Sequence, residues 1–115
     1  VSAMDPEGSV SLYKLLYKIH QKYNMTVIVV EHNLDYVLPY VTDMIVLQDG
    51  SVVASGSFEE AASIAYEDRE LRRILPALWQ VKFNLEKRDG IHLGMWRKTS
   101  DAISELKEKY GRAEL

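Results

Sequence analysis

The chain has 115 residues, a net charge of −3 and no cysteine. Its length fits one small domain, the lack of cysteine excludes disulfides and thiolate metal sites, and the absence of a basic patch argues against nucleic acid as a partner. The apolar run Val27–Val30, or six residues if Met25 and Thr26 are counted, is far shorter than the roughly 20 residues of a membrane-spanning helix. Without a signal peptide, a cytoplasmic setting is expected.

A first helix is predicted to run to about Tyr23. Asp5-Pro6-Glu7 has the form of a helix start, with an N-cap, a proline at the first helical position and an acid in the first turn. Asn24 suits a left-handed end. Apolar residues recur at helical spacing and predict an amphipathic stripe: Leu12, Leu15, Leu16 and Ile19.

A buried strand is predicted over Met25–Val30, because four of these six residues are Val or Ile. A helix followed by such a strand is the second half of a βαβ unit. The first strand is therefore expected before Val1, and the chain, which opens without Met, is expected to be a piece of a longer protein. His32 follows the strand at its carboxyl end, where open α/β sheets bind ligands.

His32 is the first candidate for a functional residue. A lone histidine is more often structural, but its place at a strand tip favours a ligand-contacting role, since a neutral imidazole can donate one hydrogen bond and accept another. Glu31 is interpreted as an edge or packing carboxylate and not as a base, because successive side chains of a strand point to opposite faces. From spacing alone, the opening loop Ser2-Ala3-Met4-Asp5 is an ordinary helix cap.

The middle of the chain predicts a hairpin and a capped helix. Asp49-Gly50 separates two short apolar runs and is a strong hairpin signal. Ser57 with Glu60 three residues later is a capping box. Before the hairpin, Asn33 or Glu31 is expected to cap a short helix that is disturbed at Pro39.

The carboxyl-terminal half is predicted to be helical. Helices are expected over 67–75 and 76–88, followed by a loop over 91–98 and a last helix capped by Thr99 or Ser100. Three aromatic residues in this half form either a contact surface or a small helical core, two alternatives of about equal weight: Trp79, Phe83 and Trp96. His20 and His92 have no sequence partners at metal-ligand spacing, and no metal site is predicted.

Four ordered motifs in residues 1–62 resemble the ATP-binding subunits of ABC transporters. Ser2-Ala3-Met4-Asp5-Pro6 is similar to the D-loop of that family, with Met4 in place of the usual Leu. Residues 27–34 resemble the strand and switch loop, although Asn33 stands where an Asp is frequent. Residues 43–56 resemble the closing hairpin. The helical tail is similar to that of the cobalt and energy-coupling-factor group, with Thr99–Leu106 as its last motif.

The resemblance implies an α/β fold, the C-terminal part of a P-loop NTPase (ABC ATPase) domain over residues 1–62, followed by a helical extension over 63–115. It implies that His32 is a catalytic residue that contacts the γ-phosphate and the attacking water. The D-loop residues Ser2, Ala3, Met4 and Asp5 would lie at the interface with a second ABC ATPase domain, in a homodimer or a heterodimer.

The resemblance also implies ATP and Mg²⁺ as cofactors of the full-length protein, transmembrane transporter subunits as partners, and a place at the cytoplasmic membrane. The sequence contains neither a glycine-rich phosphate loop with Lys and Ser/Thr nor an Leu-Ser-Gly-Gly-Gln signature. No ATP binding or hydrolysis is therefore expected from this chain alone. Two alternatives remain open, a non-catalytic dimerisation or docking module and an ABC ATPase without a transport role.

Overall fold

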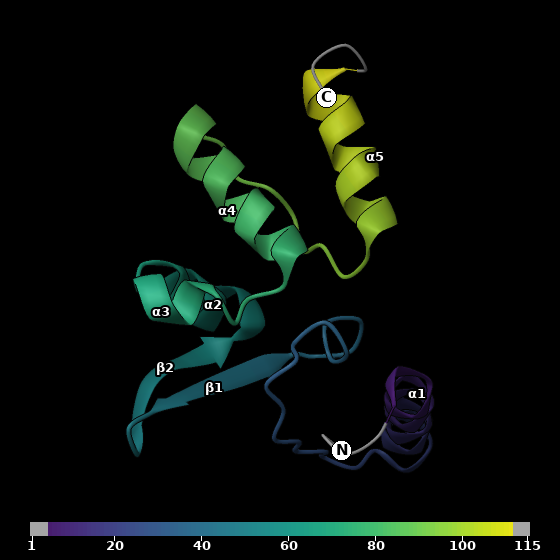
Figure 1. Cartoon of the computed structure of the whole chain (residues 1–115). Helices are drawn as coiled ribbons and strands as arrows, with labels where there is room; N and C mark the ends of the chain where they lie inside the picture. Colours follow the sequence, from purple (N-terminus) through teal and green to yellow (C-terminus); the bar gives the residue numbers. More distant parts are fainter. Residues whose placement is uncertain (1–4, 112–115) are drawn as a thin grey trace.

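The computed structural model describes residues 5–111, which form five helices and one hairpin (Figure 1). In chain order the elements are α1 (Pro6–Tyr23), β1 (Asp43–Gln48), β2 (Ser51–Ser57), α2 (Phe58–Tyr66), α3 (Arg69–Arg72), α4 (Ala77–Asp89) and α5 (Thr99–Tyr110). Among the described residues, no helix combines the length and the apolar character that crossing a membrane would require.

The predicted ends of α1 are confirmed. The Asp5 side chain accepts a 2.7 Å hydrogen bond from the Gly8 N–H, and Asn24 closes the helix in the left-handed conformation, at φ 52°. The predicted stripe is only partly covered, because Leu15 is 53% exposed. The residues that α1 buries are Ser9 and Tyr13, since the neighbour of α1 is the segment that carries Tyr36 and Tyr40.

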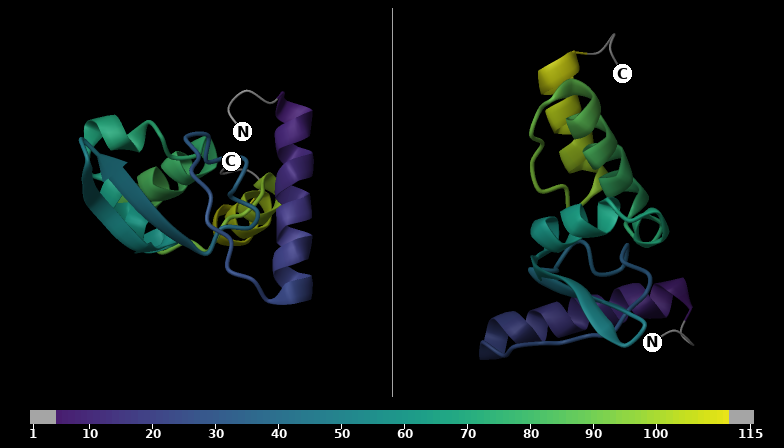
Figure 2. Two further views of the ribbon diagram at one scale, coloured as in Figure 1. Left: turned by 90° about the horizontal axis from the view of Figure 1, so that it is seen from below. Right: turned by 90° about the vertical axis from the view of Figure 1, so that its left-hand side faces the viewer.

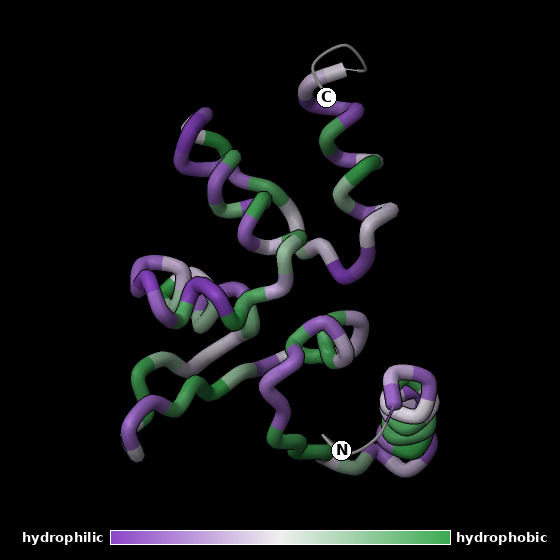
Figure 3. The backbone as a smooth tube through the Cα atoms, viewed as in Figure 1, coloured by the Kyte–Doolittle hydropathy of each residue, from purple (hydrophilic) through white to green (hydrophobic). Residues whose placement is uncertain are grey.

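The prediction of a buried strand over Met25–Val30 is wrong for this structure. The segment is extended but unpaired, and Ile28 and Val30 are 87% and 95% exposed. A parallel strand needs a neighbouring strand to satisfy its N–H and C=O groups. The only strands among the described residues, β1 and β2, pair with each other. The apolar run is visible as the green stretch between α1 and the turn before β1 (Figure 3).

The hairpin and the capping box are confirmed. β1 and β2 pair antiparallel, and Asp49 and Gly50 both have positive φ, 52° and 77°, as a tight type I′ turn requires. The Ser57 hydroxyl accepts from the Glu60 N–H at 3.1 Å, and Glu60 Oε1 accepts from the Ser57 N–H at 3.0 Å. These reciprocal bonds turn the chain from β2 into α2, which covers one face of the hairpin (Figure 1).

The helical half departs from the prediction at two helix starts. The helix expected over 67–75 is restricted to α3, where Asp68 caps the first turn by accepting from the Glu70 and Leu71 N–H groups. The N-cap of α5 is Lys98 rather than Thr99 or Ser100, because Asp101 turns back to accept from the Arg97 and Lys98 N–H groups. α2 runs through the boundary predicted between residues 62 and 63.

The core lies between the hairpin and the helical half, and α1 lies apart from α4 and α5, to the side of the hairpin and beyond the segment that precedes β1 (Figures 1 and 2). A second, smaller core joins α4, α5 and the loop between them around Leu93, Trp96 and Ala102. The radius of gyration is 15.4 Å, whereas a compact domain of this length has one of about 13 Å. The chain therefore leaves more apolar surface uncovered than a closed domain does.

Candidate functional site

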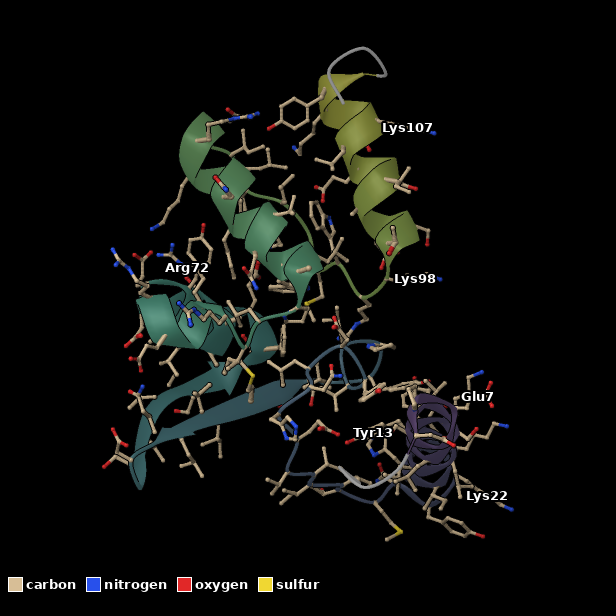
Figure 4. All side chains as sticks on the ribbon, viewed as in Figure 1. Glu7, Tyr13, Lys22, Arg72, Lys98 and Lys107 are labelled. Atoms are coloured by element: carbon tan, nitrogen blue, oxygen red, sulfur yellow. The ribbon has the colours of Figure 1, made fainter. Side chains whose placement is uncertain are left out.

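His32 stands at the end of the extended segment, and the residue before it is firmly held. The Tyr13 hydroxyl donates a 2.8 Å hydrogen bond to Glu31 Oε2, and Tyr13 reaches from α1 toward this segment (Figure 4). Glu31 Oε1 accepts from the backbone N–H groups of His32 and Asn33, at 3.0 and 3.1 Å. The interpretation of Glu31 as a packing carboxylate is confirmed by these contacts.

The electrostatics of this contact favour a charged Glu31 and a neutral Tyr13. The hydrogen bond from Tyr13 holds the pKa of Glu31 below its ordinary value, against the opposing effect of burial, and the two backbone N–H groups act in the same direction. Burial and the neighbouring Glu31 carboxylate raise the pKa of Tyr13 to about 12. Glu31 is therefore a fixed anion that orients the backbone of the loop, and it is not a group that exchanges protons near neutral pH.

The His32 side chain is free to meet a ligand. It is 82% exposed, whereas the Glu31 side chain beside it is only 6% exposed, and His32 Nδ1 lies 4.0 Å from Glu31 Oε1. An imidazole in this position can donate one hydrogen bond and accept another. The site thus combines a buried carboxylate, which anchors the backbone of the loop, with an exposed imidazole at its tip.

The opening loop contributes one described residue, Asp5. Its carboxylate is used as the N-cap of α1, which is the local role that spacing alone favoured. The D-loop positions Ser2, Ala3 and Met4 lie outside the described residues. No hydrogen bond between described residues joins Asp5 to His32, so the structure does not bring these two candidates together.

Sequence reasoning missed a charged cluster around Lys82. The Lys82 side chain is completely buried, and its ammonium donates to Glu59 Oε2 at 2.8 Å and to Glu86 Oε2 at 3.2 Å. The same ammonium lies 4.5 Å from the centre of the Trp79 ring. The His92 ring is 80% exposed and lies within 4.0 Å of both carboxylates, which are neighbours that the spacing of residues in the sequence does not reveal.

The cluster contains a geometric candidate for a metal site, because one ligand atom from each of Glu59, Glu86 and His92 lies within 4.8 Å of the others. Lys82, however, already bonds to one oxygen of each carboxylate. A side-chain cation thus fills the position that a metal ion would need, and the cluster is an internal ion-pair network between α2 and α4. Only its Lys82–Glu86 pair has a sequence signal, the i,i+4 spacing on one helix.

The aromatic residues of the helical half form core and not a contact surface. Trp79, Phe83 and Trp96 are 0%, 6% and 1% exposed. The Trp79 ring packs edge-on against Phe58 at 4.8 Å between centroids, and its Nε1 donates to the Trp96 carbonyl at 2.7 Å. The alternative of an exposed aromatic pairing surface is therefore wrong for this structure, and the alternative of a helical core is confirmed.

Comparison with known proteins finds relatives of this chain among the energy-coupling factor transporter ATP-binding proteins. The energy-coupling factor transporter ATP-binding protein EcfA2 of Bacillus cereus is 34% identical over 92 residues, which cover 80% of this chain and 31% of the relative. The EcfA2 proteins of Geobacillus kaustophilus and Halalkalibacterium halodurans are each 26% identical, over 94% and 96% of this chain and 39% and 41% of their own lengths. No protein-family model and no solved structure matches the chain.

The chain thus spans about a third of the length of the curated relatives it matches. The similarity nevertheless extends over nearly the whole of the chain, including the helical half, for which the motifs were short. The resemblance inferred from the motifs is confirmed: this chain is homologous to the ATP-binding proteins of energy-coupling factor transporters and corresponds to the C-terminal portion of an ABC ATPase.

Proposed function

We propose that this chain is part of the ATP-hydrolysing subunit of an ABC-type importer of the energy-coupling-factor group, and that the subunit powers transmembrane transport. In this proposal residues 1–62 belong to the C-terminal part of a P-loop ATPase domain and residues 63–115 form a helical extension. The whole subunit uses ATP and Mg²⁺, pairs with a second ABC ATPase domain and docks on transmembrane subunits at the cytoplasmic side of the membrane.

The observation that carries the proposal is the presentation of His32. An exposed imidazole stands directly after an anchored carboxylate, in a chain whose relatives are named as ATP-binding proteins. A structural histidine would be expected to have a buried ring with fixed partners, and His32 has an 82% exposed side chain instead. This exposure supports a ligand-contacting role.

The residues of this chain do not make a nucleotide site by themselves. The chain offers one imidazole toward a phosphate, whereas phosphate binding in P-loop proteins depends on a glycine-rich loop with Lys and Ser/Thr, which the sequence does not contain. We therefore propose that the phosphate loop and the Mg²⁺ ligands come from the rest of the subunit. His32 donates a hydrogen bond from one ring nitrogen toward the γ-phosphate position and orients water with the other.

The D-loop is assigned the partner-facing role in the same proposal. Ser2, Ala3, Met4 and Asp5 would face the second ATPase domain, while Asp5 also keeps its capping bond to Gly8. This arrangement would link the partner domain to the amino-terminal end of α1, and α1 contacts the segment before His32 through Tyr13.

The test is ATP hydrolysis by the full-length subunit carrying His32→Ala. We expect kcat to fall about 100-fold or more, because the γ-phosphate and water lose their orienting group. His92→Ala is the matched control, since His92 is also exposed (80%) but lies in the Lys82 cluster, and it should keep wild-type kcat. Equal kcat for His32→Ala and wild type would contradict the role of His32.

A second measurement tests the division of labour between this chain and the rest of the subunit. Titration calorimetry of the 115-residue chain with Mg-ATP is expected to show no binding, because no phosphate loop is present in the sequence. Saturable binding by the isolated chain would contradict the proposal that the phosphate-holding groups lie elsewhere.

A further inference from the structure

The turn that follows His32 is held by a residue from the far end of the chain. In this turn the Leu38 N–H donates to the Leu34 carbonyl at 3.0 Å. Carbonyl groups at the end of a helical turn have no partner within that turn. Arg97 Nη1 donates to two of them, the Leu38 carbonyl at 3.2 Å and the Val41 carbonyl at 2.8 Å.

These two bonds are long-range and involve a charged donor. They join residues 59 and 56 positions apart in the sequence, so they exist only when the helical half is docked on the turn. An arginine that satisfies the last carbonyls of a helical turn is a recognised way to end it, and a charged donor makes a stronger bond than a neutral one. The guanidinium is partly buried, which limits competition from water.

The position of Arg97 is set by the two helices on either side of its loop. Its backbone N–H donates to Asp101 Oδ2 at 2.9 Å, at the start of α5. The preceding residue, Trp96, accepts from Trp79 Nε1 in α4 at 2.7 Å and donates from its own Nε1 to Glu105 in α5 at 2.8 Å. The guanidinium is therefore fixed relative to α4 and α5.

The turn connects the Arg97 guanidinium to the residues next to His32. Leu34, Val37 and Leu38 are all buried, and the Leu34 carbonyl accepts from the Val37 and Leu38 N–H groups. A shift of the carbonyl end of the turn therefore shifts Leu34, which lies two residues after His32. On its other side His32 follows Glu31, which is held by α1.

We propose that Arg97 is a positioning residue for His32, through which the helical extension acts on the exposed imidazole. The loop that carries His32 is then held by two contacts. Tyr13 of α1 binds Glu31 before it, and Arg97 of the extension binds the turn after it. This inference rests on the proposed function in one respect, because it takes His32 to act on the nucleotide; the contact between Arg97 and the turn can be tested without nucleotide.

The first test is amide hydrogen exchange on the 115-residue chain. In Arg97→Ala, the amides of Val37, Leu38 and Val41 should exchange about tenfold faster than in wild type, while the amides of β1 and β2 keep their rates. Arg97→Lys should recover part of the protection, because it keeps one charged donor. Arg73→Ala removes an exposed arginine and serves as the matched control.

Unchanged exchange in the turn of Arg97→Ala would overturn the proposal. Equal acceleration in the turn and in β1 and β2 would overturn it as well, since that pattern indicates general destabilisation. If Arg97→Ala unfolds the chain, Arg97→Lys decides, because a position-specific role predicts faster exchange confined to the turn in this milder variant.

The second test links the contact to His32 in the full-length subunit. Arg97→Ala should lower kcat for ATP about tenfold with the KM unchanged, and should have no further effect when His32 is already alanine. Equal effects of Arg97→Ala in both backgrounds would overturn the positioning role. If the proposed function of His32 is wrong, His32→Ala will have wild-type kcat. The hydrogen-exchange experiment would still test the contact between Arg97 and the turn.

Discussion

The Tyr13 hydroxyl in α1 and the Glu31 carboxylate before His32 are joined by a 2.8 Å hydrogen bond between two side chains that are almost fully buried. The extended segment that leads to Glu31 has no strand partner among the described residues. Its end is therefore fixed by a side-chain contact rather than by a sheet ladder. This phenol–carboxylate pair therefore helps to set the position of His32 relative to α1.

Removing the Tyr13 hydroxyl should destabilise the chain. In Tyr13→Phe the ring keeps its packing against Tyr36, but the Glu31 carboxylate loses its donor. We expect the free energy of unfolding to fall by about 1–2 kcal/mol at neutral pH, measured by urea denaturation. The matched control is Tyr17→Phe, whose hydroxyl accepts from Gln21 on the exposed side of α1; equal losses in both variants would contradict the importance of the Glu31 contact.

The same pair predicts how stability depends on acid. The pKa of Glu31 is lower in the folded chain than its ordinary value of 4.5 because Tyr13 donates to the carboxylate. Its contribution is therefore complete above the unfolded pKa and is lost as the pH falls through the folded pKa. The difference in free energy of unfolding between wild type and Glu31→Gln should shrink as the pH is lowered from about 6 to about 3; a constant difference would contradict this assignment.

In alkali the sign is reversed, because the pKa of Tyr13 is raised from 10.0 to about 12. A group with a raised folded pKa stabilises the fold fully below its unfolded pKa, and loses that contribution as the pH rises through the folded value. Wild type should therefore lose stability relative to Tyr13→Phe between about pH 10 and about pH 12. The free energy of unfolding of both proteins can be measured by denaturant titration at each pH. If it depends on pH in the same way for both, the interaction between Tyr13 and Glu31 is contradicted.

Local signals explain why much of the fold was predictable from the sequence. The N-cap Asp5, the left-handed Asn24, the Asp49–Gly50 turn and the Ser57 capping box each depend on residues within about four positions, and all four are present. The strand predicted over Met25–Val30 depends instead on a neighbour in space. Composition indicates that such a segment suits a buried strand but cannot supply the partner that pairs with it.

The contacts that were not predictable join residues far apart in the sequence. Glu59 and Lys82 lie 23 positions apart, and Arg97 and Leu38 lie 59 apart. Lysine and arginine are usually solvated, so a sequence gives no reason to bury these two. For the candidate site, the sequence placed His32 at the end of an extended run, but neither the Tyr13–Glu31 bond nor the Arg97 contact has a motif of its own.

The buried Lys82 should be among the most sensitive polar residues to substitution. Lys82→Ala removes the cation shared by Glu59 and Glu86 and the stem that packs on Trp79 and Phe83. We expect a loss of about 3 kcal/mol in the free energy of unfolding, because two carboxylates lose their partner. Lys82→Met keeps most of the stem and should lose less, which separates packing from charge.

The control for Lys82 is another lysine of α4. Lys87 pairs with Glu67, but both side chains are more than half exposed, and exposed ion pairs contribute about 1 kcal/mol or less. Lys87→Ala should therefore change the denaturation midpoint only slightly. A similar midpoint for Lys82→Ala and Lys87→Ala would show that the buried network contributes little to stability.

The extended segment should promote self-association without contributing to stability. Ile28 and Val30 are 87% and 95% exposed in an unpaired, apolar stretch, and such a stretch is a template for pairing with another chain. Replacing both with Thr should leave the free energy of unfolding within about 0.5 kcal/mol of the wild-type value and lower the associated fraction in sedimentation velocity.

Val37→Thr is the matched control, because Val37 is 7% exposed. It should lower the free energy of unfolding by about 1–2 kcal/mol, since it places a hydroxyl in the core. An unchanged associated fraction in the double variant would show that copies of the chain do not associate through this segment.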